Sequence, residues 1–227
     1  MTSQITGRRG LIALVAVCAM AASLPAPASD WGFGRVQGSG VEKTETRNVG
    51  DFTRVEVSGA TVLEISAGQS ATSVSVTADD NILPLIETKV VAGVLRIGSE
   101  RSHSRKLPVT VKIGMPKLEG IQASGSSKIN ATNVNSASFE LHGSGSTKAV
   151  VAGTAGTVKL HLSGASNVDA SKLTAKDGNI HASGASDVEI NASDSLTVHI
   201  SGAGKVLYSG HPTITQEISG AGRIAAR

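Results

Sequence analysis

The chain has 227 residues, a formal net charge of +3, and only 2% aromatic and 17% charged residues. This length suits one sizeable domain or two small ones. The charge is weak and no Lys/Arg cluster lies beside aromatic residues, so the composition excludes a nucleic-acid-binding surface. β-branched residues recur in alternating runs and provide apolar surface to bury, which argues for a folded β protein.

The N-terminus predicts a secretory signal peptide over residues 1–28. Arg8 and Arg9 supply the positive charge, and the apolar run 11–22 is shorter than the roughly 20 residues that span a membrane. Residues 26–28 (APA) form a small-residue cleavage site. We therefore expect an exported protein that is periplasmic, on the outer surface or secreted, without a transmembrane span after cleavage. The alternative is a retained N-terminal anchor helix.

Removal of the signal peptide would leave no cysteine, because the only one, Cys18, lies inside it. The exported chain would then contain no disulfide. Residues 29–40 are glycine-rich and predict a flexible leader. Trp31 and Phe33 in this leader could instead dock on a partner.

The next part, residues 41–116, shows strand patterns without a regular repeat. The strand-like runs are 52–57, 62–65, 74–76, 94–97 and 109–113. The stretch Ile82 to Val91 predicts one short helical turn near Pro84, and residues 98–106 predict a polar loop. Ser58-Gly59 resembles an early copy of a unit that recurs later, so we expect irregular opening rungs that cap a regular structure.

A repeat dominates residues 117–227. A Ser-Gly pair followed by two small residues recurs every 18 to 20 residues. The pairs are Ser124-Gly125, Ser144-Gly145, Ser163-Gly164, Ser183-Gly184, Ser201-Gly202 and Ser219-Gly220. A fixed period of this length is typical of repeat proteins, whose units stack to bury a common core.

Apolar residues alternate with polar ones on both sides of each Ser-Gly pair, as Val158, Leu160 and Leu162 illustrate. A period of two on either side of a glycine predicts strand, tight corner, strand. A single unit cannot bury a core, so we expect units stacked in parallel register about 4.8 Å apart. The predicted fold is an all-β, parallel β-helix (β-solenoid), right-handed, with irregular N-terminal rungs over 41–116 and regular ones over 117–227.

Three stretches carry a family resemblance: DFTRVEVSGA from Asp51, PKLEGIQASGSS from Pro116 and YSGHPTITQEISGAGRI from Tyr208. With the Ser-Gly repeats between them, residues 41–227 resemble the family named "putative auto-transporter adhesin, head GIN domain". The resemblance implies a parallel β-helix-like fold in a bacterial envelope or secreted protein; the word adhesin in the family name rests on likeness to trimeric adhesin heads. It supplies no catalytic residues.

The candidate functional residues are histidines that share one position, two residues before the serine of each pair. They are His142, His161, His181 and His199, with Gln122 and Glu217 in the flanking repeats. This register predicts an outward column with one imidazole per repeat. The column could be a purely structural ladder of stacked rings, a pH-responsive binding surface, or a site for a soft divalent metal. We expect the first and therefore assign no metal.

The sequence gives weaker support for a catalytic function. Asp169 and Asp187 lie near corners of adjacent repeats, and Asp177 and Asp194 fall in predicted turns, so a glycosidase-like acid pair is conceivable. Solvated acids are the simpler interpretation. The Ser-Gly pairs lack the setting of a nucleophile elbow or a dinucleotide-binding loop. We expect no catalytic residues and no cofactor.

The sequence thus favours an exported, non-enzymatic β-solenoid that acts as an adhesin-like binding module of the bacterial cell envelope. Its partner would be an envelope or extracellular protein or a glycan. The alternative is an envelope structural or signalling module that binds another protein, and a carbohydrate-active enzyme is third. A free terminal strand edge also favours homo-oligomerisation or capping.

Overall fold

The computed structural model describes residues 35–99 and 101–227. The predicted signal peptide (1–28), Trp31 and Phe33 lie outside these residues. The expectation of an all-β protein is confirmed: the described residues form fifteen strands and one short 3-10 turn, with no α-helix among them. Over the same ranges, no helix is long and apolar enough to cross a membrane.

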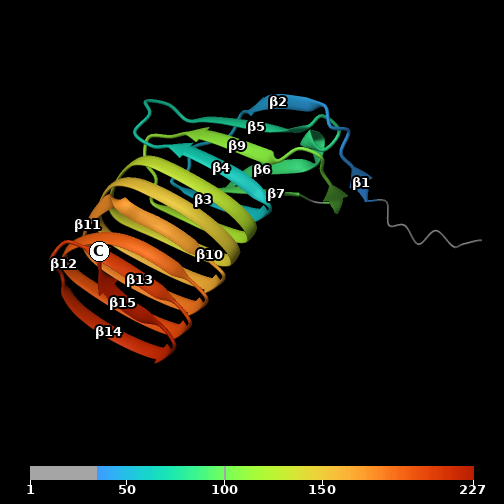
Figure 1. The fold of residues 1–227 in the computed structure, drawn as a ribbon. Coiled ribbons are helices and arrows are strands. Elements are labelled where there is room, and N and C mark those ends of the chain that lie inside the picture. The colour runs from blue at the N-terminus through green and yellow to red at the C-terminus, as the bar shows by residue number, and fades with distance from the viewer. Residues whose placement is uncertain (1–34, 100) are drawn as a thin grey trace, which may run out of the picture. The chain divides into compact units, whose positions relative to one another are not determined.

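The part before Gly120 mixes parallel and antiparallel pairs (Figure 1). Its elements are β1 (Val36–Gln37), β2 (Glu42–Arg47), β3 (Arg54–Gly59), β4 (Thr61–Ser66), β5 (Ser73–Asp79), the 3-10 turn η1 (Leu83–Leu85), β6 (Ile86–Val91), β7 (Val94–Ser99), β8 (His103–Ser104) and β9 (Val109–Gly114). β5 pairs antiparallel with both β2 and β9, and β6 pairs antiparallel with β7. The predicted helical turn is η1, although the rest of that stretch is strand β6.

From Gly120 the strands are parallel and regular. They are β10 (Gly120–Gly164), β11 (Asn167–Gly184), β12 (Asp187–Gly202), β13 (Lys205–Ser209), β14 (Thr213–Gly220) and β15 (Arg223–Ala226). Around the Ser-Gly corners each repeat pairs in register with the next, so that Gly164 lies opposite Gly184, and Gly184 opposite Gly202; the register shifts elsewhere, between Val150 and Ala152 and again between Ala170 and Asp177. Ser58-Gly59 pairs in the same register with Ser124-Gly125, which confirms it as the first copy of the unit.

Burial follows the alternation in the sequence. Val158, Leu160 and Leu162 are buried, whereas Lys159 and His161 between them face outward. This is the period of two that a strand imposes on its side chains. One hydrophobic core runs from Phe52 through the irregular part and along the repeats to Val206. The two predicted parts of the domain therefore share a single core.

The corners stack through their backbones. At three successive corners the residue after the glycine donates its N–H to the glycine carbonyl of the preceding repeat: Ala165 to Gly145, Ala185 to Gly164 and Ala203 to Gly184, each at 2.9 Å. Such close stacking satisfies polar backbone groups where the strand direction changes. From Gly125 onward it also leaves no room for a side chain on the corner glycine, because an added Cβ would overlap the carbonyl oxygen of the glycine in the preceding repeat.

The described end of the predicted leader, Arg35 to Gly40, departs from the expectation of flexibility. It contains β1, which pairs with β8, and it contacts the buried carboxylate of Asp79. That carboxylate accepts hydrogen bonds from the backbone N–H groups of Gly40 (2.7 Å), Lys106 and Leu107 (3.1 Å each). A buried charge requires such partners, so Asp79 joins the leader to the loop before β9.

Candidate functional site

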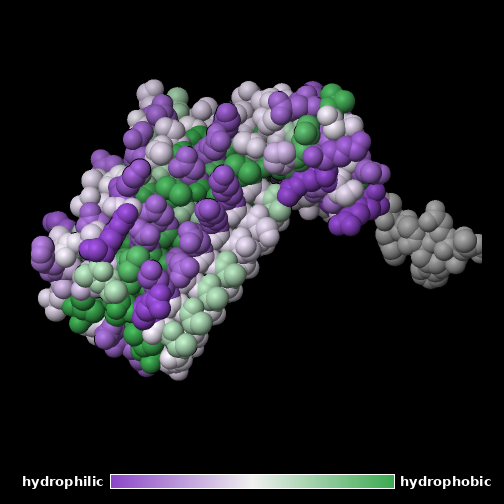
Figure 2. Space-filling model, in the orientation of Figure 1, coloured by the Kyte–Doolittle hydropathy of each residue, from purple (hydrophilic) through white to green (hydrophobic). Residues whose placement is uncertain are grey.

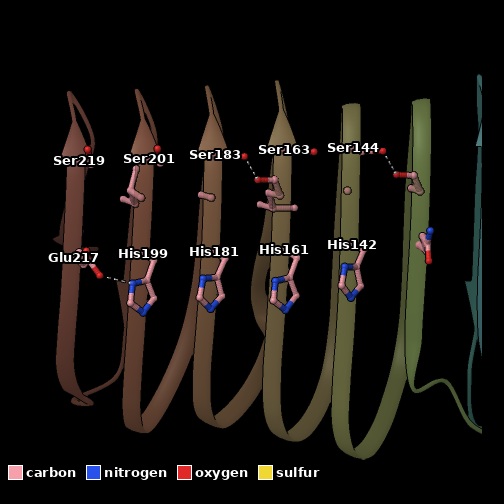
Figure 3. Close-up of a pocket in the computed structure, with 16 residues that line it drawn as sticks. His142, Ser144, His161, Ser163, His181, Ser183, His199, Ser201, Glu217 and Ser219 are labelled. Carbon is pink, nitrogen blue, oxygen red and sulfur yellow. Dashed lines mark hydrogen bonds and ion pairs between the residues drawn. The ribbon is translucent and has the colours of Figure 1, made fainter.

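The four predicted histidines form one column on the outer face of β10, β11 and β12 (Figure 3). Their rings are stacked in sequence order with centroids 4.6, 5.1 and 4.7 Å apart and planes within 10° of parallel. The spacing follows from the distance between neighbouring strands, because each ring comes from the same position of successive repeats. The prediction of an outward column is therefore confirmed, as is its continuation by Glu217, which pairs with His199.

A second column runs beside the first. The serines of the Ser-Gly pairs lie two residues further along each strand and on the same face (Figure 3). Together the two columns line a groove of about 770 Å³ that extends from Gln122 and Ala123 to Glu217 and Ser219. Its floor is apolar or small, with Leu162 and Ala182 among its lining residues. The groove thus presents hydroxyls and imidazoles repeated once per strand over an apolar base.

One end of the histidine column carries a carboxylate that the sequence interpretation overlooked. His142 Nε2 donates a hydrogen bond to Glu140 Oε1 at 2.8 Å, and Arg54 Nη1 binds Glu140 Oε2 at 3.1 Å. The hydrogen bond from His142 and the positive guanidinium of Arg54 hold the pKa of Glu140 below its ordinary value, although burial opposes this. The sequence spacing could have revealed this pair, because Glu140 and His142 are two residues apart and such residues lie on the same face of a strand.

The opposite end has a similar but more exposed pair. His199 Nδ1 lies 3.1 Å from Glu217 Oε2 on the neighbouring strand β14. The Glu217 side chain is 80% exposed, compared with 23% for Glu140. Solvent weakens an ion pair of this kind, so the two ends of the column differ in electrostatic environment although both pair a histidine with a glutamate.

Within the column, the pKa of the His161 imidazole is lowered. Partial burial is the main cause, and the neighbouring imidazoles of His142 and His181 and the ammonium of Lys159 add to it, while Glu140 opposes it. The folded protein therefore binds a proton at His161 less tightly than the unfolded chain does. As the pH falls below about 6.5, the ordinary pKa of histidine, protonation of His161 in the unfolded chain lowers the free energy of unfolding.

We expect His161 to titrate at a lower pH than free histidine when its ring protons are followed by NMR. Replacing His181 by glutamine should raise that midpoint, because the substitution removes one repelling charge. A Lys176→Gln change, which removes an exposed charge from the same strand β11, is the control. A midpoint at or above that of free histidine, or equal responses to the two substitutions, would contradict the interpretation.

Asp169 and Asp187, considered for catalysis, line one small pocket but are offset in register. Asp187 pairs in register with Asn167, not with Asp169. Asp169 accepts hydrogen bonds from the N–H and hydroxyl of Ser171, which lower its pKa, whereas a general acid needs a raised one. Asp177 and Asp194 lie within β11 and β12 and not in turns, so that expectation was wrong; their carboxylates accept from serine hydroxyls.

The chain is similar in fold to several proteins whose structures have been solved. It is similar to a crystal structure of a "putative adhesin" from Bacteroides fragilis, with 21% identity, a TM-score of 0.69, and coverage of 85% of this chain and 100% of that one. It is also similar to a "putative adhesin" from Parabacteroides merdae (18%, TM-score 0.51) and a "putative lipid binding protein" from Parabacteroides distasonis (20%, TM-score 0.51). Each covers 85% of this chain and 99% of its own.

At sequence identities of 18–21%, the similarity to these structures concerns the fold alone. A search of curated proteins found no match to the chain. The family described as "Putative auto-transporter adhesin, head GIN domain" matches residues 51–212, which include the irregular strands from β3 onward, the four histidines and most of the Ser-Gly repeats. This match covers well over half of the chain and agrees with the resemblance drawn from the sequence. The chain therefore belongs to the auto-transporter adhesin, head GIN domain family.

Proposed function

We propose that residues 41–227 form a β-solenoid that serves as an exported, non-enzymatic, adhesin-like binding module of the bacterial cell envelope. Its ligand lies along the groove between the serine and histidine columns. The family supports an envelope or extracellular setting, and the predicted signal peptide would direct export.

The observation that carries this proposal is the repetition within the groove. Imidazoles recur every 4.6 to 5.1 Å, with a serine hydroxyl beside each one. Weak contacts that repeat along one ligand add up to useful affinity, because after the first contact the others form at high effective concentration. An extended glycan or peptide with regularly spaced polar groups fits such a surface.

The groove also argues for binding over catalysis. Its described side chains are mainly hydroxyls and imidazoles, and its carboxylate, Glu217, is largely exposed. Glycoside hydrolysis needs two carboxylates across the scissile bond, one with a raised pKa. The groove as described does not place two carboxylates opposite each other.

The test is binding of the full chain to a glycan array and to envelope polysaccharides, with affinities then measured by biolayer interferometry. Ser183→Tyr places a bulky ring in the middle of the groove and should weaken binding at least tenfold, or about 1.4 kcal/mol. Thr174→Tyr, at an exposed position of the same strand β11, is the matched control and should bind normally. Equal affinity of the two variants would overturn the proposed groove.

A second candidate function rests on the last strands. Among the strands of the described residues, β14 pairs only with β12, and its Ile214 and Ile218 are 37% and 36% exposed. Figure 2 shows hydrophobic side chains gathered at this end of the stack. A free parallel edge can accept a strand from another protein or a second copy. Loss of partner capture with Ile218→Lys, but not with Ser183→Tyr, would favour this alternative.

Time-dependent release of products from a polysaccharide would instead indicate an enzyme.

A further inference from the structure

We propose that Glu140, His142 and His161 bind one divalent transition-metal ion, such as Zn²⁺, at the β3 end of the histidine column. One ligand atom from each side chain lies within 4.8 Å of the other two. A carboxylate oxygen with two imidazole nitrogens is a donor set that Zn²⁺ and its neighbours in the first transition row accept readily. Across residues 35–99 and 101–227, this is the one group of three such donors in reach of each other.

The geometry requires only small side-chain movements. Zinc bonds of about 2.0–2.2 Å place two tetrahedral ligands roughly 3.4 Å apart. Glu140 and His142 are closer than this, at 2.8 Å, because they share a proton. The metal takes the place of that proton on Nε2. A neutral His142 ring then carries its proton on Nδ1, whereas a doubly protonated ring releases one proton to solvent. His161 must move towards the pair, and it can rotate because the outer face of the column is partly open to water.

Surrounding charges orient the site and set its strength. Arg54 holds Glu140 Oε2 at 3.1 Å, which leaves Oε1 directed at His142. Such a partner behind a ligand commonly fixes its orientation. The positive charges of Arg54 and Lys159 oppose binding of a cation, whereas the ionised Glu140 attracts it. We expect an affinity well below that of a closed four-ligand structural zinc site.

Three protein ligands leave a coordination position open, as in catalytic zinc sites. His142 and His161 also line the groove, so this position faces the space where a groove ligand would lie. The metal site does not depend on the proposed binding function, because the ion would bind without any groove ligand.

The other end of the column provides a matched control. His199 and Glu217 form a similar pair at 3.1 Å, but no third donor joins them within the described residues. Glu217 is also 80% exposed. A metal that required only a histidine–glutamate pair would bind at both ends equally.

The experiment is calorimetric titration of the untagged full chain with ZnCl₂ at pH 7.5, with Co²⁺ absorption as a report of coordination geometry. We expect one ion per chain. Glu140→Gln and His161→Gln should each weaken binding at least about tenfold, since even loss of an outer partner of a ligand costs that much. Glu217→Gln and His199→Gln should leave binding unchanged.

Wild-type affinity in both Glu140→Gln and His161→Gln would overturn the proposal. Equal losses in the His199→Gln control would overturn it too, because they would indicate diffuse binding along the whole column. Thermal unfolding of each variant without metal checks folding. If Glu140→Gln unfolds at a lower temperature than wild type, His161→Gln decides the outcome, because the His161 side chain is partly exposed and its contacts in the column are stacking contacts with His142 and His181.

Discussion

Replacing Gly164 by alanine is expected to lower the free energy of unfolding by about 3 kcal/mol or more, through backbone strain and steric overlap together. Gly164 has a φ of +91°, a region that costs an L-residue roughly 1–2 kcal/mol. An added Cβ would also lie 2.5 Å from the carbonyl oxygen of Gly145 in the preceding repeat. The backbone cannot move away without breaking the hydrogen bond from Ala165 to that oxygen.

Gly59 separates the two causes. It occupies the first corner of the stack with a similar φ of +85°, but an added Cβ there meets no atom within 4 Å. Gly59→Ala should therefore cost only the backbone term of about 1–2 kcal/mol. Urea unfolding followed by circular dichroism measures both variants. If Gly59→Ala is as destabilising as Gly164→Ala, close stacking does not explain the glycine at the corners.

Truncation of Phe139 to alanine is the second large effect, with an expected loss of about 3–5 kcal/mol. Phe139 is fully buried, and by volume it is the largest of the fully buried side chains in the described core. The substitution removes a whole aromatic ring from a position with no exposure to solvent. A cavity adds to the lost transfer free energy when the surroundings relax only partly.

Val150→Ala is the control for this substitution. Val150 lies in the same strand, β10, but is 36% exposed. Its truncation should change the free energy of unfolding by only ~0.5 kcal/mol. The same urea titrations serve here, and comparable losses for the two variants would show that the core tolerates a void at Phe139.

The repeat explains why so much of the regular part could be predicted. A constant Ser-Gly spacing sets the register, and register assigns every side chain to the inner or the outer face. The apolar positions are consequently buried, and the histidines form a column with ring spacings near the distance between strands. In such a protein each unit contacts its neighbours, so a one-dimensional pattern carries most of the three-dimensional information.

The irregular part could not be predicted to the same degree. The runs at 74–76 and 109–113 were recognised as strands, but alternation does not reveal whether a strand pairs parallel or antiparallel. Only the structure shows β5 lying antiparallel between β2 and β9. The ordered end of the leader has a similar origin, because Asp79 binds Gly40 across 39 residues of sequence.

The sequence by itself determined the all-β fold, the stacked Ser-Gly corners, the four-histidine column and membership of the adhesin-like family, because all of these follow from a repeated local pattern. Only the tertiary structure decided that the column ends differ. Arg54 reaches Glu140 from 86 residues away and directs its other oxygen at His142. A contact between residues so distant in sequence arises from how strands pack, and no repeat pattern encodes it.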